Sequence, residues 1–251
     1  MAKGQQKKIS IIPLGGLGEI GKNMTAFRYG EEIILVDAGL AFPDDEMLGI
    51  DLVIPNFSYL VENKDKVKAI FLTHGHEDHI GAMPYVMKEL NCPVYGCPLT
   101  LGILSGRLRE NGVSDQKCKA VKAGATVRAG SFRVEFIHVN HSIPDAVSLA
   151  IHTPVGTIVH TGDYKFDQTP VDGQPTDFAR LAEIGDKGVL LLLADSTNIE
   201  RPGFTPSEKN VGKTLDEQFR AAKNRIIVAT FSSNVHRLQQ VIDAAVMTRR
   251  K

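Results

Sequence analysis

The eight residues T-H-G-H-E-D-H-I, at positions 73–80, constrain this chain more than any other feature. They place three histidines and one aspartate within six positions, directly after an apolar run at 67–72 that predicts a buried strand. Imidazole and carboxylate groups bind zinc or manganese, and ligands crowded into one loop at a strand end can face two ions. The pattern therefore predicts a metal site rather than a polar loop with incidental histidines.

The spacing H-x-H-x-D-H resembles the signature of the metallo-β-lactamase superfamily. In that superfamily the first two histidines serve one metal, the Asp-His pair serves the other, and a later histidine and aspartate complete the site. The resemblance implies six ligands: His74, His76 and His141 for the first metal, Asp78 and His79 for the second, and Asp163 shared by both. It also implies that Asp37, which follows a strand predicted at 33–36, orients the loop without binding metal.

The two later ligands each follow a predicted strand. His141 begins H-S-I-P-D after a strand predicted at 132–139, and Asp163 lies in H-T-G-D-Y after a strand predicted at 157–160. Three other histidines, His138, His152 and His160, lie inside strand-like runs, where a core or surface histidine is the ordinary interpretation. They are left out of the predicted site.

A glycine-rich segment near the start imitates a dinucleotide-binding motif. Residues 16–21, G-L-G-E-I-G, match G-x-G-x-x-G and follow a strand predicted at 9–14. A Rossmann unit needs a full helix before the next strand, yet residues 24–29 already predict a strand followed by a turn. The sequence therefore predicts a hairpin, with glycines that let the loop pass close to the metals.

Six segments along the chain resemble the ribonuclease J family, in the β-CASP branch of the superfamily. They are P-L-G-G-L-G-E-I-G-K-N at 13–23, D-A-G-L-A-F-P at 37–43, T-H-G-H-E-D-H-I-G-A-M-P-Y at 73–85, H-S-I-P-D at 141–145, H-T-G-D-Y-K at 160–165 and A-D-S-T-N at 194–198. The resemblance implies an α+β fold: a metallo-β-lactamase αββα four-layer sandwich, incomplete at its carboxyl end. It also implies the start of an α/β β-CASP insert, the domain that grips nucleic acid in this branch.

Length and charge suggest where that insert begins. Family members are longer than 251 residues, so the resemblance implies an amino-terminal fragment that lacks the last metal-binding histidine. Residues 209–251 hold nine Lys and Arg against three Asp and Glu, a balance of +6, whereas residues 1–208 carry −6. We therefore expect the metallo-β-lactamase domain at 1–208 and the β-CASP insert from 209 to 251. Within the insert the pattern predicts helices at 211–222 and 235–246 and a strand at 225–230.

Three further sites follow from the resemblance, each with an ordinary alternative. The turn Ser232, Ser233 and Asn234 would hold an RNA phosphate, or simply cap the helix that comes next. Asp195, after an apolar run at 189–194 that predicts a buried strand, matches a catalytic β-CASP aspartate, or caps the turn at 196–197. Gly49 and Asp51 would contribute to a structural calcium site, or Asp51 is a plain surface carboxylate.

The resemblance implies a metal-dependent ribonuclease, both an endonuclease and a 5′ to 3′ exonuclease, in RNA maturation and decay. A hydroxide held between two zinc ions, with manganese as the alternative, would attack the phosphorus, positioned by Asp78 or Asp163. The partner would be RNA, preferentially 5′-monophosphorylated, and the full-length enzyme would be a homo-oligomer or a hetero-oligomer with a paralogue. Two alternatives are a non-catalytic partner subunit and a small-molecule hydrolase, such as a thioesterase or lactonase; the fragment itself is expected to be impaired.

The remaining sequence features predict a cytoplasmic protein. The three cysteines are odd in number and lack zinc-finger spacing, which favours free thiols. Residues 1–8 are charged but no sufficiently long apolar segment comes after them, so no signal peptide is expected. The longest apolar run, at 189–194, is too short to span a bilayer, so no membrane association is expected.

Overall fold

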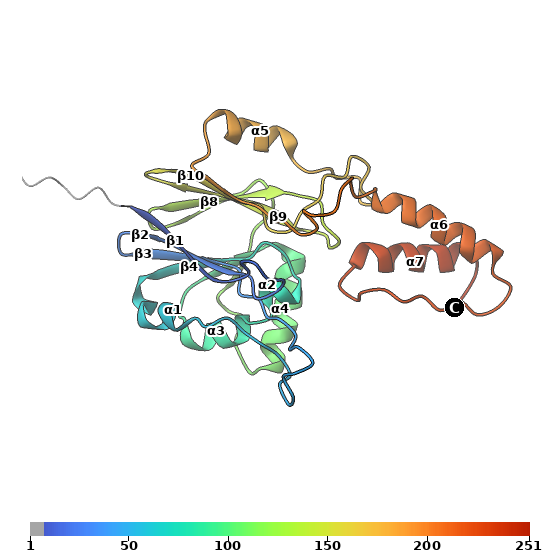
Figure 1. Ribbon diagram of the computed structural model, residues 1–251, viewed down its shortest axis with the longest axis horizontal. Helices are drawn as coiled ribbons and strands as arrows, with labels where there is room; N and C mark the ends of the chain where they lie inside the picture. The colour runs from blue at the N-terminus through green and yellow to red at the C-terminus, as the bar shows by residue number, and fades with distance from the viewer. Residues whose placement is uncertain (1–7) are drawn as a thin grey trace, which may run out of the picture.

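The computed structural model describes residues 8–251, which form two facing β-sheets with helices on both outer sides (Figure 1). Residues 1–7, which include most of the charged segment considered as a signal peptide, lie outside the described residues. Among residues 8–251 no helix has both the length and the apolar character needed to cross a membrane.

The first sheet has six strands, ordered β1-β2-β3-β4-β5-β6. They are β1 (Ile9–Gly15), β2 (Met24–Tyr29), β3 (Glu32–Val36), β4 (Val67–Phe71), β5 (Val94–Gly96) and β6 (Cys118–Ala120). Strands β1 to β3 pair antiparallel, and β3 to β6 pair parallel. Because β1 and β2 form a hairpin with no helix between them, the predicted hairpin is confirmed and a Rossmann unit is excluded.

The second sheet has five strands, ordered β11-β10-β9-β8-β7. They are β7 (Thr126–Ala129), β8 (Phe132–His138), β9 (Val147–Thr153), β10 (Gly156–His160) and β11 (Leu191–Leu193). Strands β7 to β10 form an antiparallel meander, and β11 pairs parallel to β10 at one edge. Both sheets are therefore mixed.

Alternating side chains of the strands build the layers of the core. On β3, Ile34 and Val36 enter the apolar cluster between the sheets, which they share with Phe136 of β8. Ile33 and Leu35 point to the opposite face and pack in the cluster beneath the helices. Because successive strand residues face opposite sides, an unbroken apolar run such as I-I-L-V predicts a strand covered on both faces, as this one is.

Helices close the two outer faces and confirm the four-layer αββα sandwich. The face of the first sheet is covered by α1 (Ser58–Glu62), the 3-10 helix η1 (Lys64–Lys66), α2 (Glu77–Ile80), α3 (Met83–Glu89) and α4 (Pro98–Glu110), whereas α5 (Phe178–Asp186) covers the second sheet. On that second face, the Arg180 guanidinium of α5 makes ion pairs with Glu135 of β8, at 2.6 Å from Nε to Oε1.

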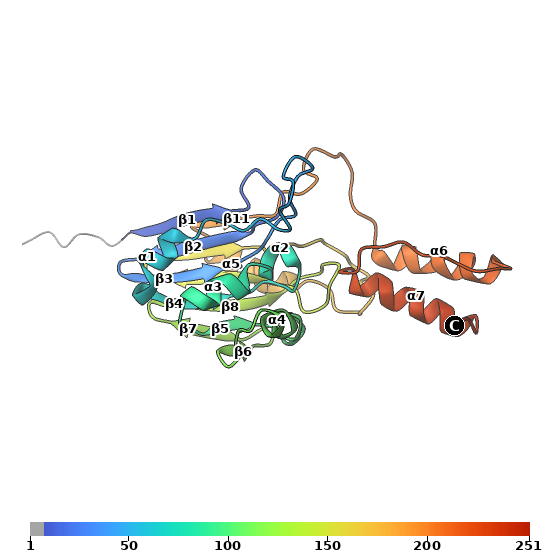
Figure 2. The ribbon, with the colours of Figure 1, turned by 90° about the horizontal axis from the view of Figure 1, so that it is seen from below.

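The last two helices, α6 (Glu208–Ala221) and α7 (Val235–Met247), lie side by side and project from one end of the sandwich (Figure 2). They agree with the helices predicted at 211–222 and 235–246. Ser207 caps α6 by accepting from Lys209 N, and Asn234 caps α7 by accepting from Arg237 N. An Arg237–Glu208 ion pair of 2.6 Å links the two helices.

Two predicted strands differ from the structure. Residues 225–230 are extended but form no strand, because no neighbouring strand among the described residues offers them backbone partners. The run at 189–194 contains only the short strand β11, and it is not buried: Leu190 is 53% exposed and Leu192 is 59% exposed. Its apolar character suggested cover on both faces, but β11 is the edge strand and, within residues 8–251, nothing pairs beyond it.

Candidate metal centre

The octapeptide leaves the carboxyl end of β4 as a short loop and then forms α2. This loop packs closely against two other loops because each of them has a glycine at the point of contact, Gly39 in one and Gly162 in the other. A Cβ at Gly39 would lie 1.5 Å from the Asp78 carbonyl oxygen, so only glycine permits the close approach of the two chains. At Gly162, whose φ is 57°, a Cβ would lie 3.0 Å from Thr73 Cβ. The loops carrying the histidines and the aspartates thus pack directly against each other.

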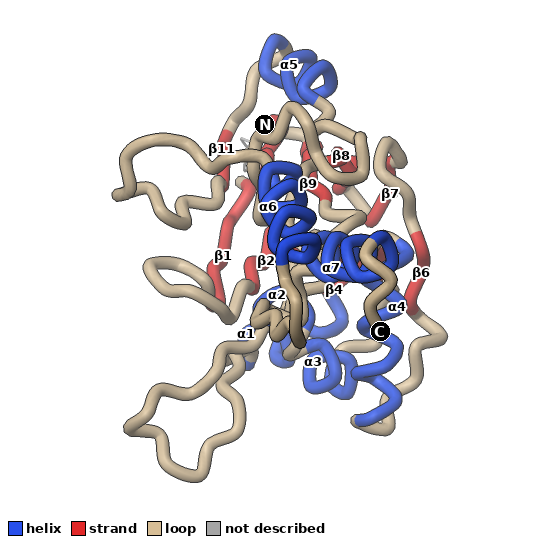
Figure 3. The backbone as a smooth tube through the Cα atoms, turned by 90° about the vertical axis from the view of Figure 1, so that its right-hand side faces the viewer, coloured by secondary structure: helices blue, strands red, loops and turns tan. Residues whose placement is uncertain are grey.

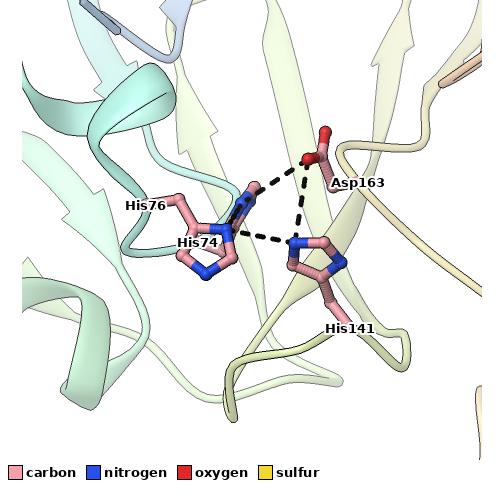
Figure 4. A group of neighbouring side chains, drawn as sticks. All are labelled: His74, His76, His141 and Asp163. Atoms are coloured by element: carbon pink, nitrogen blue, oxygen red, sulfur yellow. Dashed lines mark hydrogen bonds and ion pairs between the residues drawn. The ribbon is translucent and has the colours of Figure 1, made fainter. Parts of the chain in front are cut away.

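The first group of side chains comprises His74, His76, His141 and Asp163, whose ligand atoms all lie within 4.8 Å of one another (Figure 4). His76 Nδ1 lies 3.1 Å from His74 Nε2 and 3.1 Å from His141 Nε2. Asp163 Oδ2 lies 3.9 Å from His74 Nε2 and 3.7 Å from His141 Nε2. Three imidazole nitrogens and one carboxylate oxygen thus converge on one point, as a tetrahedral metal ion requires.

The second group comprises Asp78, His79 and Asp163. His79 Nε2 lies 3.2 Å from Asp163 Oδ1 and 3.5 Å from Asp78 Oδ2. Asp163 therefore turns one oxygen toward each group. Its place between them is the one that a bridging carboxylate would occupy.

Burial prepares the first group to bind a cation. Burial, together with the charges of the neighbouring histidines, lowers the pKa of His74 well below its usual value. Burial also lowers the pKa of His141 to about 4, despite the nearby charge of Asp163. For Asp163, burial raises the pKa, but the hydrogen bond from His79 and the surrounding histidines outweigh it and lower the pKa to about 2. At neutral pH this group therefore holds neutral imidazoles and an ionised carboxylate.

Asp37 holds the second group in place from behind. This side chain is 1% exposed and occupies a left-handed backbone conformation, with φ 57°. Its Oδ1 accepts from Thr73 N at 2.8 Å, and its Oδ2 accepts from Thr73 Oγ1 at 2.7 Å and from His79 Nδ1 at 2.8 Å. Since Nδ1 of His79 donates to Asp37, Nε2 is the atom that faces Asp163. These contacts match the supporting role expected for Asp37.

Asn23 is a neighbour of the metal centre that the sequence alone did not single out. Its Nδ2 donates to the Asp78 carbonyl at 3.1 Å and lies 3.1 Å from His79 Nε2. Asn23 ends the glycine-rich loop between β1 and β2, so this loop does pass beside the proposed second metal. The signal available in the sequence was its place at the end of the family-like segment at 13–23.

The turn before α7 also reaches the metal centre. His76 Nε2 donates to the Ser233 carbonyl oxygen at 3.2 Å, which leaves His76 Nδ1 free to face the other histidines. Figure 3 views the molecule from this end, where α6 and α7 lie across the end of the sandwich from which α2 emerges. The turn carrying Ser232, Ser233 and Asn234 is thus beside the metal ligands, while the Asn234 side chain caps α7.

Two other predicted sites do not belong to the two ligand groups. Asp195 donates its backbone N–H to Thr161 Oγ1 and accepts from Thr197 N at 2.8 Å, so its side chain makes the turn-capping contact that was the ordinary alternative. Gly49 and Asp51 lie in an exposed loop, and no ligand group of three side chains forms there among the described residues. The catalytic role of Asp195 and the calcium site stay predictions.

The three histidines left out of the site behave differently from one another. His138 Nε2 donates to the Gln174 carbonyl, and His152 lies between Glu135 and Thr157, so both have structural partners. His160 accepts from Gly162 N through Nδ1. Burial lowers the pKa of His160, and the charges of Asp37, His79 and Asp163 also act on it, so this histidine lies near the metal centre without belonging to either ligand group.

Protonation should distinguish the two metal groups. Burial opposes the charged form of His79, but Asp37 and Asp163 raise its pKa well above the usual value. In the metal-free protein at pH 7, His79 is therefore in its charged form, with a proton on both ring nitrogens. A first metal ion should release almost no protons, whereas an ion entering the second group should release about one, from His79. Raising the pH should therefore strengthen the second site, while the first weakens only as the pH falls toward about 4, where His141 protonates.

Calorimetric titration of the metal-free protein at pH 7 measures this proton release, in two buffers of different ionisation heat and at metal concentrations high enough to fill the weaker second group. Equal proton release for both binding events would contradict the assignment of His79 to the second group.

Known proteins resemble this chain over nearly its whole length. A family model described as "Metallo-beta-lactamase superfamily" matches residues 17–207, and one described as "Ribonuclease J, beta-CASP domain" matches residues 223–251. The ribonuclease J of Thermus thermophilus is 49% identical over 99% of this chain and 45% of its own length. That of Helicobacter pylori (strain J99) is 49% identical over 97% of this chain and 35% of its own length.

The chain therefore spans less than half the length of these relatives. A crystal structure of a protein of unknown function from Enterococcus faecalis V583 has the same fold, with a TM-score of 0.71 at 20% identity, covering 95% of this chain and 63% of that one.

Proposed function

The chain belongs to the metallo-beta-lactamase superfamily and, within it, to the ribonuclease J family, and from this premise we propose that it forms part of a metal-dependent ribonuclease that hydrolyses RNA phosphodiester bonds. The observation that carries the proposal is the pair of ligand groups joined by Asp163, in a chain 49% identical to proteins named ribonuclease J. Residues 1–208 would be the metallo-β-lactamase domain and residues 209–251 the beginning of the β-CASP insert. The projection of α6 and α7 from the sandwich and the family match at 223–251 support this division.

His74, His76 and His141 would hold one divalent ion, Asp78 and His79 a second, with Asp163 shared between them. The fit is good, because the ligand nitrogens converge and the first group is unprotonated at neutral pH. Nitrogen-rich ligands favour zinc, with manganese as the alternative. Two such ions would lower the pKa of a bound water and supply positive charge beside the phosphate.

The protein's own groups would direct the reaction. The carboxylates of Asp78 and Asp163 can accept a hydrogen bond from the attacking water and so orient it toward the phosphorus. Asp37 and the Ser233 carbonyl hold His79 and His76 in the required tautomers. Asp195 and the turn Ser232, Ser233 and Asn234 would contact the RNA, with its 5′-monophosphate held near the amino terminus of α7. Contacts to phosphate do not read base sequence, so sequence preference should be weak.

Two alternatives can be weighed from the segment after the sandwich and from the ligand groups. A small-molecule hydrolase on this fold, such as a thioesterase or lactonase, has no use for a β-CASP segment, and the match at 223–251 therefore favours RNA. A non-catalytic partner subunit would tolerate degraded ligand groups. Both groups are intact in this chain, which favours an enzyme. Homo-oligomerisation, or pairing with a paralogue, stays a prediction.

A chimera provides the direct test of activity. Residues 8–251 would replace the aligned segment of the Thermus thermophilus ribonuclease J, because this chain spans 45% of that protein's length. We expect the chimera to hydrolyse 5′-monophosphorylated RNA only with divalent ions, and to lose activity with a chelator. A folded, metal-loaded chimera that leaves RNA intact but cleaves a thioester or lactone would establish the small-molecule alternative instead.

The 251-residue chain by itself should bind nearer one metal ion than two. The first group offers four protein ligand atoms, whereas the second offers three and shares one of them. With the second group weak or empty, the chain should show little or no ribonuclease activity, because one cation cannot share the phosphate charge as two would. Elemental analysis after dialysis measures the content; two tightly held ions, or robust RNA hydrolysis by this chain, would overturn the prediction.

A further inference from the structure

One lysine lies at the seam between the metal centre and the helices α6 and α7. Lys165 follows Asp163 by two residues, and its backbone N–H donates to the carbonyl of Asn140 at 2.8 Å. Asn140 immediately precedes His141, and the two segments form an antiparallel bridge at this point. The backbone of Lys165 is therefore held beside two of the proposed metal ligands.

The Lys165 ammonium group is held in place but its hydrogen-bond donors are not used. Nζ lies 3.6 Å from Asp167 Oδ2, which is an ion-pair distance and too long for a hydrogen bond, and the side chain is 22% exposed. The carboxylate of Asp167, which is 4% exposed, accepts hydrogen bonds from two backbone groups. Its Oδ1 accepts from Thr169 N at 2.9 Å, and its Oδ2 accepts from Glu208 N at 3.3 Å. Within residues 8–251 no group accepts a hydrogen bond from Nζ. The side chain is only partly exposed, and the three donors of its ammonium group are open to an incoming acceptor.

Lys165 supplies positive charge between the first metal group and the start of α7. Its charge acts on His141 in the first metal group and on His236 in the first turn of α7. Burial lowers the pKa of His236, partly offset by the carboxylate of Asp172, so His236 is neutral at pH 7. The acidic groups that face the seam are Asp163, Asp167, Asp172 and Glu208. Asp163 would be neutralised by metal, and Asp167 and Glu208 are engaged with backbone N–H groups and with Arg237.

We propose that Lys165 binds a phosphate oxygen of the RNA chain next to the metal centre, as a positioning contact for the reaction. The proposal rests on the proposed function and adds to it a residue outside the ligand groups and outside the turn at 232–234. A lysine ammonium is a compact point charge with three donors, which suits a phosphate oxygen approached from one side. Because Asp167 holds the side chain without satisfying its donors, little ordering is needed when the phosphate arrives.

The test compares RNA binding by the 251-residue chain and three variants. The variants are Lys165→Met, which keeps the apolar stem, Lys165→Arg, which keeps the charge, and Lys187→Met, a matched control at the exposed carboxyl end of α5. Fluorescence anisotropy with a labelled, 5′-monophosphorylated single-stranded oligoribonucleotide is recorded from about 50 to about 300 mM KCl. Melting temperature and metal content are measured on each variant.

Lys165→Met should weaken binding about tenfold at low salt and reduce the slope of log K against log salt by about 0.7, the value of one phosphate contact on a single strand. The loss should be the same for oligonucleotides of different base sequence, since phosphate carries no sequence information. Lys165→Arg should restore most of the affinity, and Lys187→Met should change it less than about twofold. Metal content and melting temperature should stay at the wild-type values.

An unchanged salt slope in Lys165→Met, with wild-type binding intact, would overturn the assignment of Lys165 and leave the proposed function standing. Loss of binding accompanied by a lower melting temperature and metal content would likewise overturn it, because Lys165 would then be structural. A wild-type chain that binds no RNA at any salt concentration would instead contradict the proposed function, and the role of Lys165 with it.

Discussion

Replacing His76 by alanine is expected to abolish RNA cleavage while leaving RNA binding largely in place. His76 Nδ1 lies 3.1 Å from the ligand nitrogens of both His74 and His141, so its loss removes the central member of the first group. Removing one charge-stabilising group from an active site costs about 10² to 10³ in rate, and losing a metal ion should cost at least about 10³. RNA affinity should change only a few-fold, because it comes mainly from basic groups contacting phosphates.

The substitution is made in the chimera with the Thermus thermophilus ribonuclease J. RNA binding is measured by gel shift, RNA hydrolysis by a cleavage assay, and metal content is determined for each protein. His138→Ala is the matched control, because His138 ends β8 and donates to the Gln174 carbonyl outside the ligand groups. We expect the control to cleave RNA at close to the parent rate. A His76→Ala protein that still cuts RNA near the parent rate after chelator treatment would show that the metal mechanism is wrong.

Replacing Asp37 by alanine should destabilise the fold and weaken the second metal group together. The change leaves Thr73 N–H, Thr73 Oγ1 and His79 Nδ1 without their acceptor in a fully buried place. Breaking a buried ion pair by removing one partner typically costs about 3–5 kcal/mol, and a lost supporting contact typically reduces metal affinity about 10- to 100-fold. Urea denaturation of the metal-free chain measures the first effect, and metal titration measures the second.

The pH dependence of this variant provides an independent check. In the folded, metal-free protein the pKa of His79 is raised well above 6.5, although burial opposes the shift, because Asp37 and Asp163 favour the charged form. This contribution to stability is therefore fully present below about pH 6.5 and is lost as the pH rises through the folded pKa. Asp37→Ala should flatten that dependence. A variant with wild-type stability at every pH would contradict the role given to Asp37.

Asp37→Asn is the matched control for the backbone. Asn tolerates a positive φ better than alanine does, so it suits the φ of 57° while removing the charge. Its amide oxygen can still accept from Thr73, whereas its NH₂ group cannot accept from His79. The asparagine variant should therefore be less destabilised than the alanine variant but should lose the same pH dependence.

Much of the site could be predicted from the sequence because its chemistry is local. The four ligand residues of the octapeptide lie within six positions of one loop, so their proximity does not depend on how the rest of the chain folds. His141 and Asp163 could be added because both follow strands, and strands that pack together bring their end loops together. Short apolar runs likewise predicted β1 to β4, β8 and β10, since such runs suit strands that are covered by neighbours. The strands β5, β6, β7 and β9 were not predicted.

Tertiary structure alone decided what reaches the site from elsewhere. The contacts of Asn23 with His79, of Ser233 with His76 and of Lys165 with Asn140 join segments far apart in sequence, and no periodicity encodes them. The same dependence explains why the strand predicted at 225–230 is absent and why the run at 189–194, which was predicted to be buried, forms only a short, exposed strand. Both runs have strand-like composition, but a strand is buried and hydrogen-bonded only through its neighbours. The strand in 189–194 has a neighbour on one side only, and residues 225–230 have no strand neighbour among the described residues. Composition thus determined which residues can bind metal and form strands, and packing decided which of those possibilities is realised.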